Sequence, residues 1–148
     1  MMKKIFISCP YIKHINSAGC FDDSEYKAFT EQLYELCQKY ADDVFMALKR
    51  DKYGEAPTKG YTCLYDYREL ENSDLVVAFP DDSMGVAVEI GWASALGKKM
   101  IIILNENQKY SPLVKDIIKI TEGETVKYQN KEIDSLNEVD KLIRMFCI

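Results

Sequence analysis

Met100-Ile-Ile-Ile-Leu104 is an unbroken run of apolar residues with three consecutive β-branched positions. Such a run is typical of a strand that is covered on both faces, as strands of parallel sheets are. Similar runs lie at Lys4–Ser8, Val44–Leu48 and Asp74–Phe79, and Thr125–Gln129 fits as a fifth strand. The sequence therefore predicts a five-stranded parallel sheet.

Amphipathic helices are predicted between these strands. The clearest has Asp22, Asp23 or Ser24 as its N-cap and one apolar stripe, formed by Tyr26, Phe29, Leu33, Leu36, Cys37 and Tyr40. The others cover Tyr61–Asn72, Met84–Leu96, Pro112–Ile120 and Leu136–Phe146. Strand and helix alternate through residues 1–148 without a repeat or a flexible linker. This order predicts a single-domain three-layer α/β/α sandwich, Rossmann-like or flavodoxin-like.

The composition narrows the classes of function. A net charge of −5 argues against a nucleic-acid polymer or an anionic membrane as partner and favours a small polar substrate. No segment has a signal-peptide pattern or the ~20 apolar residues of a membrane span, so a cytoplasmic location is expected. Five scattered cysteines and one histidine predict neither a disulfide framework nor a metal site. No GxGxxG or Walker motif is present, and no cofactor is expected.

Two long irregular stretches, His14–Cys20 and Arg50–Thr62, each follow a predicted strand. They are candidate substrate loops, because open α/β sheets bind ligands at the carboxyl ends of their strands. Phe6, Cys9 and Tyr11 flank the end of the first strand and are candidate substrate contacts. For Cys9, buried packing is favoured over a role as nucleophile.

Glu89 is the one charged residue in the helix predicted over Met84–Leu96. An ionised carboxylate in such an apolar helix costs several kcal/mol unless it is paired, hydrogen-bonded or open to a cleft. An exposed position or an ion pair with Arg68 would also explain it, so a functional carboxylate is one of two readings. At the start of the same helix, the Ser83 hydroxyl and the N–H groups of the first turn, including Gly85, are candidates to bind an anion such as phosphate.

The chain resembles the nucleoside 2-deoxyribosyltransferase superfamily in this region. The resemblance lies in Ser73-Asp-Leu-Val-Val-Ala78, then Gly85-Val-Ala-Val-Glu-Ile-Gly-Trp-Ala93, then the strand of Gly97–Leu104. It implies that Glu89 is the nucleophile, attacking C1′ of the sugar to form a covalent glycosyl-enzyme while the base departs. Asp66 matches the second catalytic carboxylate, which handles protons on the base and on the acceptor.

The motif Ser83-Met-Gly-Val86 is closest to the nucleoside 5′-monophosphate N-hydrolase branch, and Ser111 in Ser-Pro-Leu-Val matches a second phosphate-binding serine of those hydrolases. The hydrolase loop resembles Gly-Ser followed by Arg, whereas Ser8–Lys13 has no Arg. Lys13, His14 and Lys49 are the candidates to replace its charge.

Three functions follow from these patterns. The first is hydrolysis of nucleoside or deoxynucleoside 5′-monophosphates to free base and sugar phosphate. The second is 2-deoxyribosyl transfer between bases, with Asp81 or Asp82 as the acid that binds the 5′-hydroxyl. The third is a non-catalytic nucleotide sensor. The resemblance also implies a homodimer or larger homo-oligomer, whereas the base and sugar preferences are left open.

Overall fold

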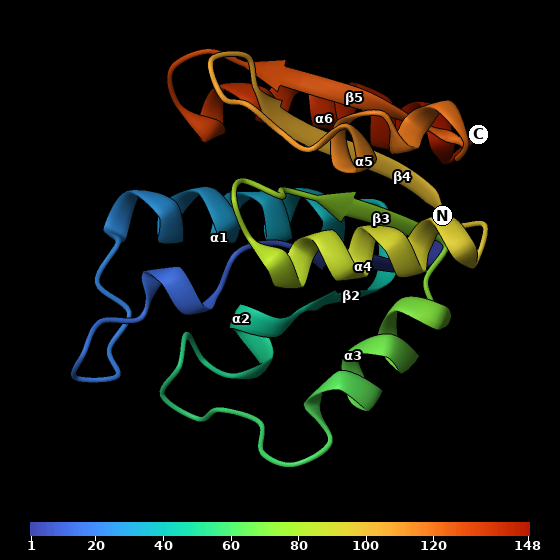
Figure 1. The fold of residues 1–148 in the computed structure, drawn as a ribbon. Helices are drawn as coiled ribbons and strands as arrows, with labels where there is room; N and C mark the ends of the chain where they lie inside the picture. The colour runs from blue at the N-terminus through green and yellow to red at the C-terminus, as the bar shows by residue number, and fades with distance from the viewer.

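The computed structural model describes all 148 residues, Met1–Ile148, and forms one sheet with helices on both faces (Figure 1). All strand pairs are parallel, in the order β2-β1-β3-β4-β5. This order is flavodoxin-like, and the predicted sandwich is confirmed. The strands are β1 (Met2–Ser8), β2 (Ala41–Met46), β3 (Leu75–Ala78), β4 (Lys99–Asn105) and β5 (Gly123–Tyr128).

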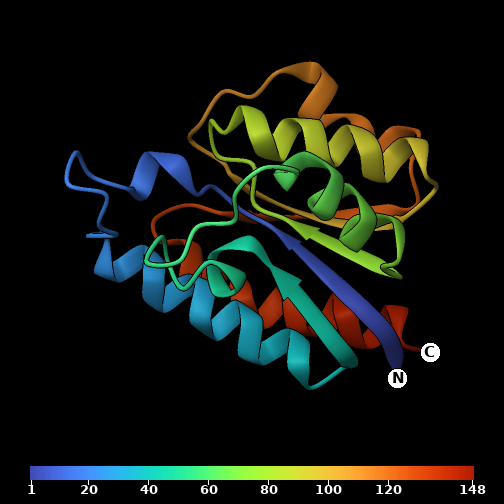
Figure 2. The ribbon, with the colours of Figure 1, turned by 90° about the horizontal axis from the view of Figure 1, so that it is seen from below.

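The helices are α1 (Ser24–Gln38), α2 (Ala47–Arg50), α3 (Thr62–Glu71), α4 (Met84–Ala95), α5 (Pro112–Lys115) and α6 (Leu136–Phe146). Short 3₁₀ turns cover Ile12–His14, Ile117–Lys119 and Glu132–Ser135. The bottom view shows α1 and α6 on one face of the sheet and α3, α4 and α5 on the other (Figure 2).

Side chains of each strand alternate between two cores. In β1, Ile5 and Ile7 pack with Leu33 of α1 and Ile143 of α6. Phe6, between them in sequence, packs in the opposite core with the helices α3 and α4. Because both faces are covered, the central strands are apolar along Ile5–Ile7, Leu75–Ala78 and Met100–Leu104, which explains the unbroken runs in the sequence.

Most predicted elements differ from the observed ones by one or two residues at their ends, and β1 and β5 each begin two residues earlier, but two predicted elements differ by more. The run predicted as a strand over Val44–Leu48 contains the end of β2 and the start of α2, and β2 begins earlier, at Ala41. Leu48 is fully buried although it is helical, so hydrophobicity did not separate the two elements. The helix predicted over Pro112–Ile120 is divided into α5 and a 3₁₀ turn at Ile117–Lys119.

The connection from β3 to α4 is strained at one residue. Asp81 has φ +44°, a left-handed conformation that is uncommon for residues other than glycine. Ser83 then caps the helix, because its Oγ accepts a hydrogen bond from the Val86 N–H at 3.2 Å. This turn brings the start of α4 to the carboxyl end of the sheet.

Candidate active site

A cavity of about 700 Å³ opens at the carboxyl ends of β1, β2 and β3. It lies where the chain leaves β1 for one edge of the sheet and β3 for the other, the place where open α/β sheets bind ligands. Its walls come from the segment after β1, from α2 and the loop that follows it, from α3, and from the start of α4. Of the two predicted substrate loops, Arg50–Thr62 contributes to the lining of the cavity, whereas His14–Cys20 contributes no lining residue and only the segment before it, Cys9–Lys13, does.

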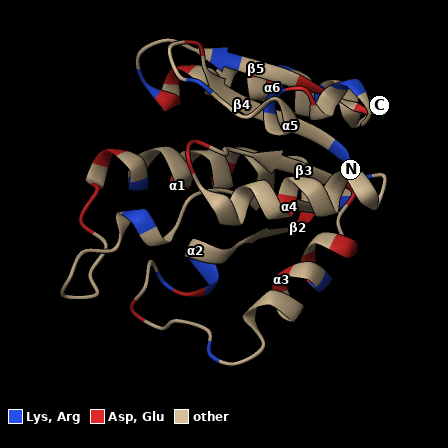
Figure 3. Ribbon diagram, in the orientation of Figure 1, with Lys and Arg blue, Asp and Glu red and all other residues tan.

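Glu89 lines the cavity from α4, a helix with almost no other charge (Figure 3). Its Oε1 accepts a hydrogen bond from the Ser8 hydroxyl at the end of β1, at 3.1 Å. Burial, together with the negative charge of Asp66, raises the pKa of Glu89 to about 8 despite the opposing effects of Ser8 and Arg50. A buried carboxyl with a perturbed pKa in a cleft is typical of a catalytic group.

Asp66 lines the same cavity from α3, so the structure brings the two predicted carboxyl groups together. Burial raises the pKa of Asp66, and its ion pair with Arg50 Nη1 opposes that rise. Arg50 also donates from Nε to Asp51 Oδ1 at 2.7 Å. The sequence prediction did not single out Arg50 or Asp51, and only their place in a candidate loop pointed to them.

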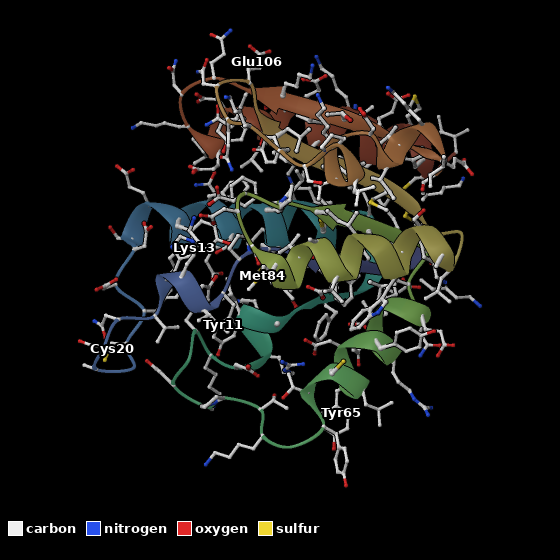
Figure 4. All side chains as sticks on the ribbon, in the orientation of Figure 1. Tyr11, Lys13, Cys20, Tyr65, Met84 and Glu106 are labelled. Atoms are coloured by element: carbon white, nitrogen blue, oxygen red, sulfur yellow. The ribbon has the colours of Figure 1, made fainter.

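The start of α4 forms another wall, with Ser83 and Gly85 in the lining. The N–H groups of the first turn have no partners within the helix, and they lie at the positive end of its dipole. Lys13 lies opposite and forms ion pairs with Asp81 and Asp82. Figure 4 shows Tyr11 and Lys13 on the segment after β1, in the same region of the molecule as Met84 at the start of α4.

Cys9 and Tyr11 also line the cavity, as the sequence analysis expects. Burial raises the pKa of the Cys9 thiol to about 12, which disfavours the thiolate form. The Tyr11 hydroxyl is buried without a hydrogen-bond partner, and burial together with the nearby Asp51 raises its pKa to about 12.

Two predicted contacts lie outside the cavity. Phe6 is completely buried, and its ring stacks on Phe45 with centroids 5.0 Å apart. Both rings belong to the core that lies under α3 and α4. Ser111 is exposed and caps α5, where its Oγ accepts a hydrogen bond from the Leu113 N–H at 3.2 Å. Neither side chain reaches the lining of the cavity in its own chain.

Of the three candidates to supply a positive charge, only Lys13 lines the cavity. Lys49 forms an ion pair with Glu31 of α1 at 2.9 Å. His14 stacks on Tyr26 with centroids 3.7 Å apart, and its Nδ1 lies 3.1 Å from Asp23. These two side chains belong to the packing around α1.

Comparison with known proteins shows the family of the chain. The family model of the nucleoside 2-deoxyribosyltransferases matches residues 17–142. The chain belongs to this family. No functionally curated sequence matches it significantly.

Several solved structures are similar to this chain over nearly its whole length. A CMP N-glycosidase of Clostridium botulinum, BcmB, is 27% identical, with a TM-score of 0.69 over 94% of this chain and 98% of that one. The solution structure of BlsM is also 27% identical, with a TM-score of 0.78 over 97% and 91% of the two chains. A 2-deoxyribosyltransferase of Bacillus psychrosaccharolyticus, 14% identical, shares the fold, with a TM-score of 0.60 over 93% and 90%. The family and these neighbours support an enzyme that acts on nucleosides or nucleotides.

No group of three or more His, Cys, Asp or Glu side chains is arranged to hold a metal ion. No helix combines the length and the apolar character that crossing a bilayer requires.

Proposed function

We propose that the protein hydrolyses the N-glycosidic bond of nucleoside 5′-monophosphates, with Glu89 as the nucleophile. The observation that carries this proposal is the Glu89 carboxyl, which lines a deep cavity, is held by Ser8, and shares that cavity with Asp66. A carboxylate in this position attacks C1′, the bond from C1′ to the base nitrogen breaks, and the base leaves with the bonding electrons. Water then cleaves the glycosyl ester and releases the sugar 5-phosphate.

The two carboxyl groups supply the proton that this reaction needs. Just below a pH of about 8 the pair holds one proton, because burial and the negative charge of Asp66 raise the pKa of Glu89. The reaction uses one ionised carboxylate to attack and one proton to neutralise the departing base. In the second step the carboxylate left without a proton accepts one from water.

The start of α4 supports a phosphorylated substrate. The positive end of the helix and the N–H groups near Gly85 face the cavity that also contains Glu89, so a 5′-phosphate there would place the sugar beside the nucleophile. Lys13 adds a positive charge once a phosphate competes with Asp81 and Asp82 for its ammonium group. The similarity to a CMP N-glycosidase makes CMP and dCMP the first substrates to test.

Asp82 favours a second candidate function, transfer of a 2-deoxyribosyl group between bases. Its side chain is exposed in the cavity wall next to Ser83, where a carboxylate accepts a hydrogen bond from an unphosphorylated 5′-hydroxyl and repels a phosphate. In that reaction a second base, instead of water, takes the sugar from Glu89. A sensor without catalysis would bind nucleotides and turn over neither class of substrate.

One panel of assays separates the three functions. The purified protein is incubated with pyrimidine and purine nucleoside 5′-monophosphates and the matching nucleosides, in ribo and deoxy forms, with and without a second free base. Chromatography then measures free base and exchanged product. Release of base from monophosphates, lost in Glu89→Gln, is expected; base exchange confined to deoxynucleosides would replace the proposal with the transferase, and binding without turnover would leave the sensor.

Self-association stays a prediction drawn from the family resemblance. Light scattering on the purified protein measures the oligomeric state directly. The exposed side chains of α3 and α4 include several apolar ones, and Figure 4 shows Tyr65 pointing away from the body of the molecule.

A further inference from the structure

Arg50 is the centre of a charged network in the wall of the cavity. Its Nη1 forms an ion pair with Asp66, and its Nε and Nη2 donate to the two oxygens of Asp51 at 2.7 and 3.4 Å. Asp51 is almost completely buried and accepts a further hydrogen bond from the Thr58 hydroxyl at 2.7 Å. Two carboxylates and one guanidinium leave the network with a net negative charge beside Glu89.

The guanidinium is held in place from a second direction. Its central carbon lies 5.3 Å from the centroid of the Phe45 ring, which in turn stacks on Phe6. The guanidinium thus rests on an aromatic platform in the core, while Asp51 fixes its orientation in the plane. A network that served only to attach the loop after α2 would be complete with Asp51 and Thr58, and would not need a donor on Asp66.

We propose that Arg50 is a positioning residue for the glycosidic reaction, which fixes the orientation of Asp66 and sets how tightly that carboxyl holds a proton. This inference rests on the proposed function of the Glu89 and Asp66 pair. The planar guanidinium gives Asp66 a directed donor that a point charge would not reproduce. The positive charge makes Asp66 a stronger acid, able to give its proton to the leaving base and to take one back from water.

The other charges around Asp66 act in the opposite direction. Asp51 from the same network and Glu69 on α3 both raise the pKa of Asp66, and the charge of Asp66 raises that of Glu89. Burial also raises both pKa values; Arg50 opposes these effects at both carboxyl groups, and Ser8 opposes them at Glu89. Changes at Arg50 and at Asp51 should therefore shift the titration of Asp66 in opposite directions.

The first test measures charge directly and needs no substrate. Protein labelled with ¹³C at the Asp side-chain carboxyls is titrated by NMR, with Asp66 assigned from the missing signal of Asp66→Asn, and folding of every variant is checked from the amide spectrum. In Arg50→Gln the midpoint of Asp66 should rise by about one pH unit or more. In Asp51→Asn, which removes a negative neighbour but leaves Arg50, it should fall. An unchanged midpoint in both variants would overturn the proposal.

The second test uses turnover of the nucleotide that the wild type hydrolyses best. In Arg50→Gln the acidic limb of the kcat/KM profile should move to higher pH, whereas Arg50→Lys should return it toward the wild-type position with a lower kcat. If both variants lose activity equally at all pH values, the role of Arg50 is structural and the proposal fails. If the wild type hydrolyses no nucleotide, the proposed function fails, and the NMR midpoints still decide whether Arg50 controls Asp66.

Discussion

Replacing Glu89 with glutamine should stabilise the protein while it abolishes turnover. Glu89 is held at a site where its charged form is poorly solvated, and the negative charge of Asp66 adds to that cost. Glutamine has nearly the same shape, keeps a hydrogen-bond partner for Ser8, and carries no charge. When a residue is kept for catalysis at the expense of stability, its replacement is expected to raise the stability and to lower the activity.

The magnitude follows from the pKa of Glu89, which rises from an ordinary value of 4.5 to about 8 in the folded protein. One pKa unit corresponds to about 1.4 kcal/mol, so complete ionisation of Glu89 would lower the free energy of unfolding by at most about 5 kcal/mol. Part of the side chain is accessible to water in the cavity, which reduces this limit. We expect Glu89→Gln to gain about 1 to 3 kcal/mol at pH 9, or roughly 3 to 10 °C in Tm.

The stability difference between wild type and Glu89→Gln should change with pH in one direction. A group whose pKa is raised by folding contributes stability that is fully present below its unfolded pKa and is lost as the pH rises through its folded pKa. The wild type should therefore weaken relative to Glu89→Gln between about pH 4.5 and pH 8, with the two most similar at the acidic end.

Urea unfolding of both proteins at several pH values measures this difference. Glu55→Gln is the matched control, because Glu55 is exposed and forms no ion pair, and its difference from the wild type should not vary with pH. A difference between wild type and Glu89→Gln that stays constant from pH 5 to pH 9 would refute the reasoning, because the Glu89 carboxyl would then be as well solvated in the folded as in the unfolded protein.

Four further outcomes are expected. The kcat/KM of the wild type should fall as the pH rises through about 8, because the carboxyl pair then loses the proton that the departing base needs; initial rates between pH 5.5 and 9.5 show this. Ser8→Ala should lower kcat/KM by roughly 10- to 100-fold near neutral pH and move that fall to higher pH, because the 3.1 Å hydrogen bond to the carboxylate is lost. Ser83→Asp should shift the preference from monophosphates toward nucleosides, measured as a ratio of kcat/KM values. Leu33→Ala should cost about 2 to 5 kcal/mol in urea unfolding without changing the pH profile, because Leu33 is fully buried against the sheet away from the cavity.

The prediction from sequence was strongest where local pattern and burial coincide. The run at Met100–Leu104 is apolar throughout because β4 is covered by helices on both sides, and the structure places it inside the sheet. The predicted start of α1 was also confirmed, with Asp23 as the cap that accepts a hydrogen bond from the Tyr26 N–H. The prediction failed at β2, where a buried helical turn continues a strand's apolar run and the two cannot be separated by hydrophobicity.

The family, the parallel strands and the place of Glu89 as the one charge in an apolar helix were all predictable from local sequence, because each depends on residues that are close together in the chain. Which side chains share the cavity follows only from the folded chain. It brings Arg50 to Asp66 across 16 positions and Ser8 to Glu89 across 81, and it leaves Phe6 in the core and Ser111 at the surface. These contacts depend on the order of the strands in the sheet and on how the loops pack over its edge, and neither can be read from the spacing of residues in the sequence.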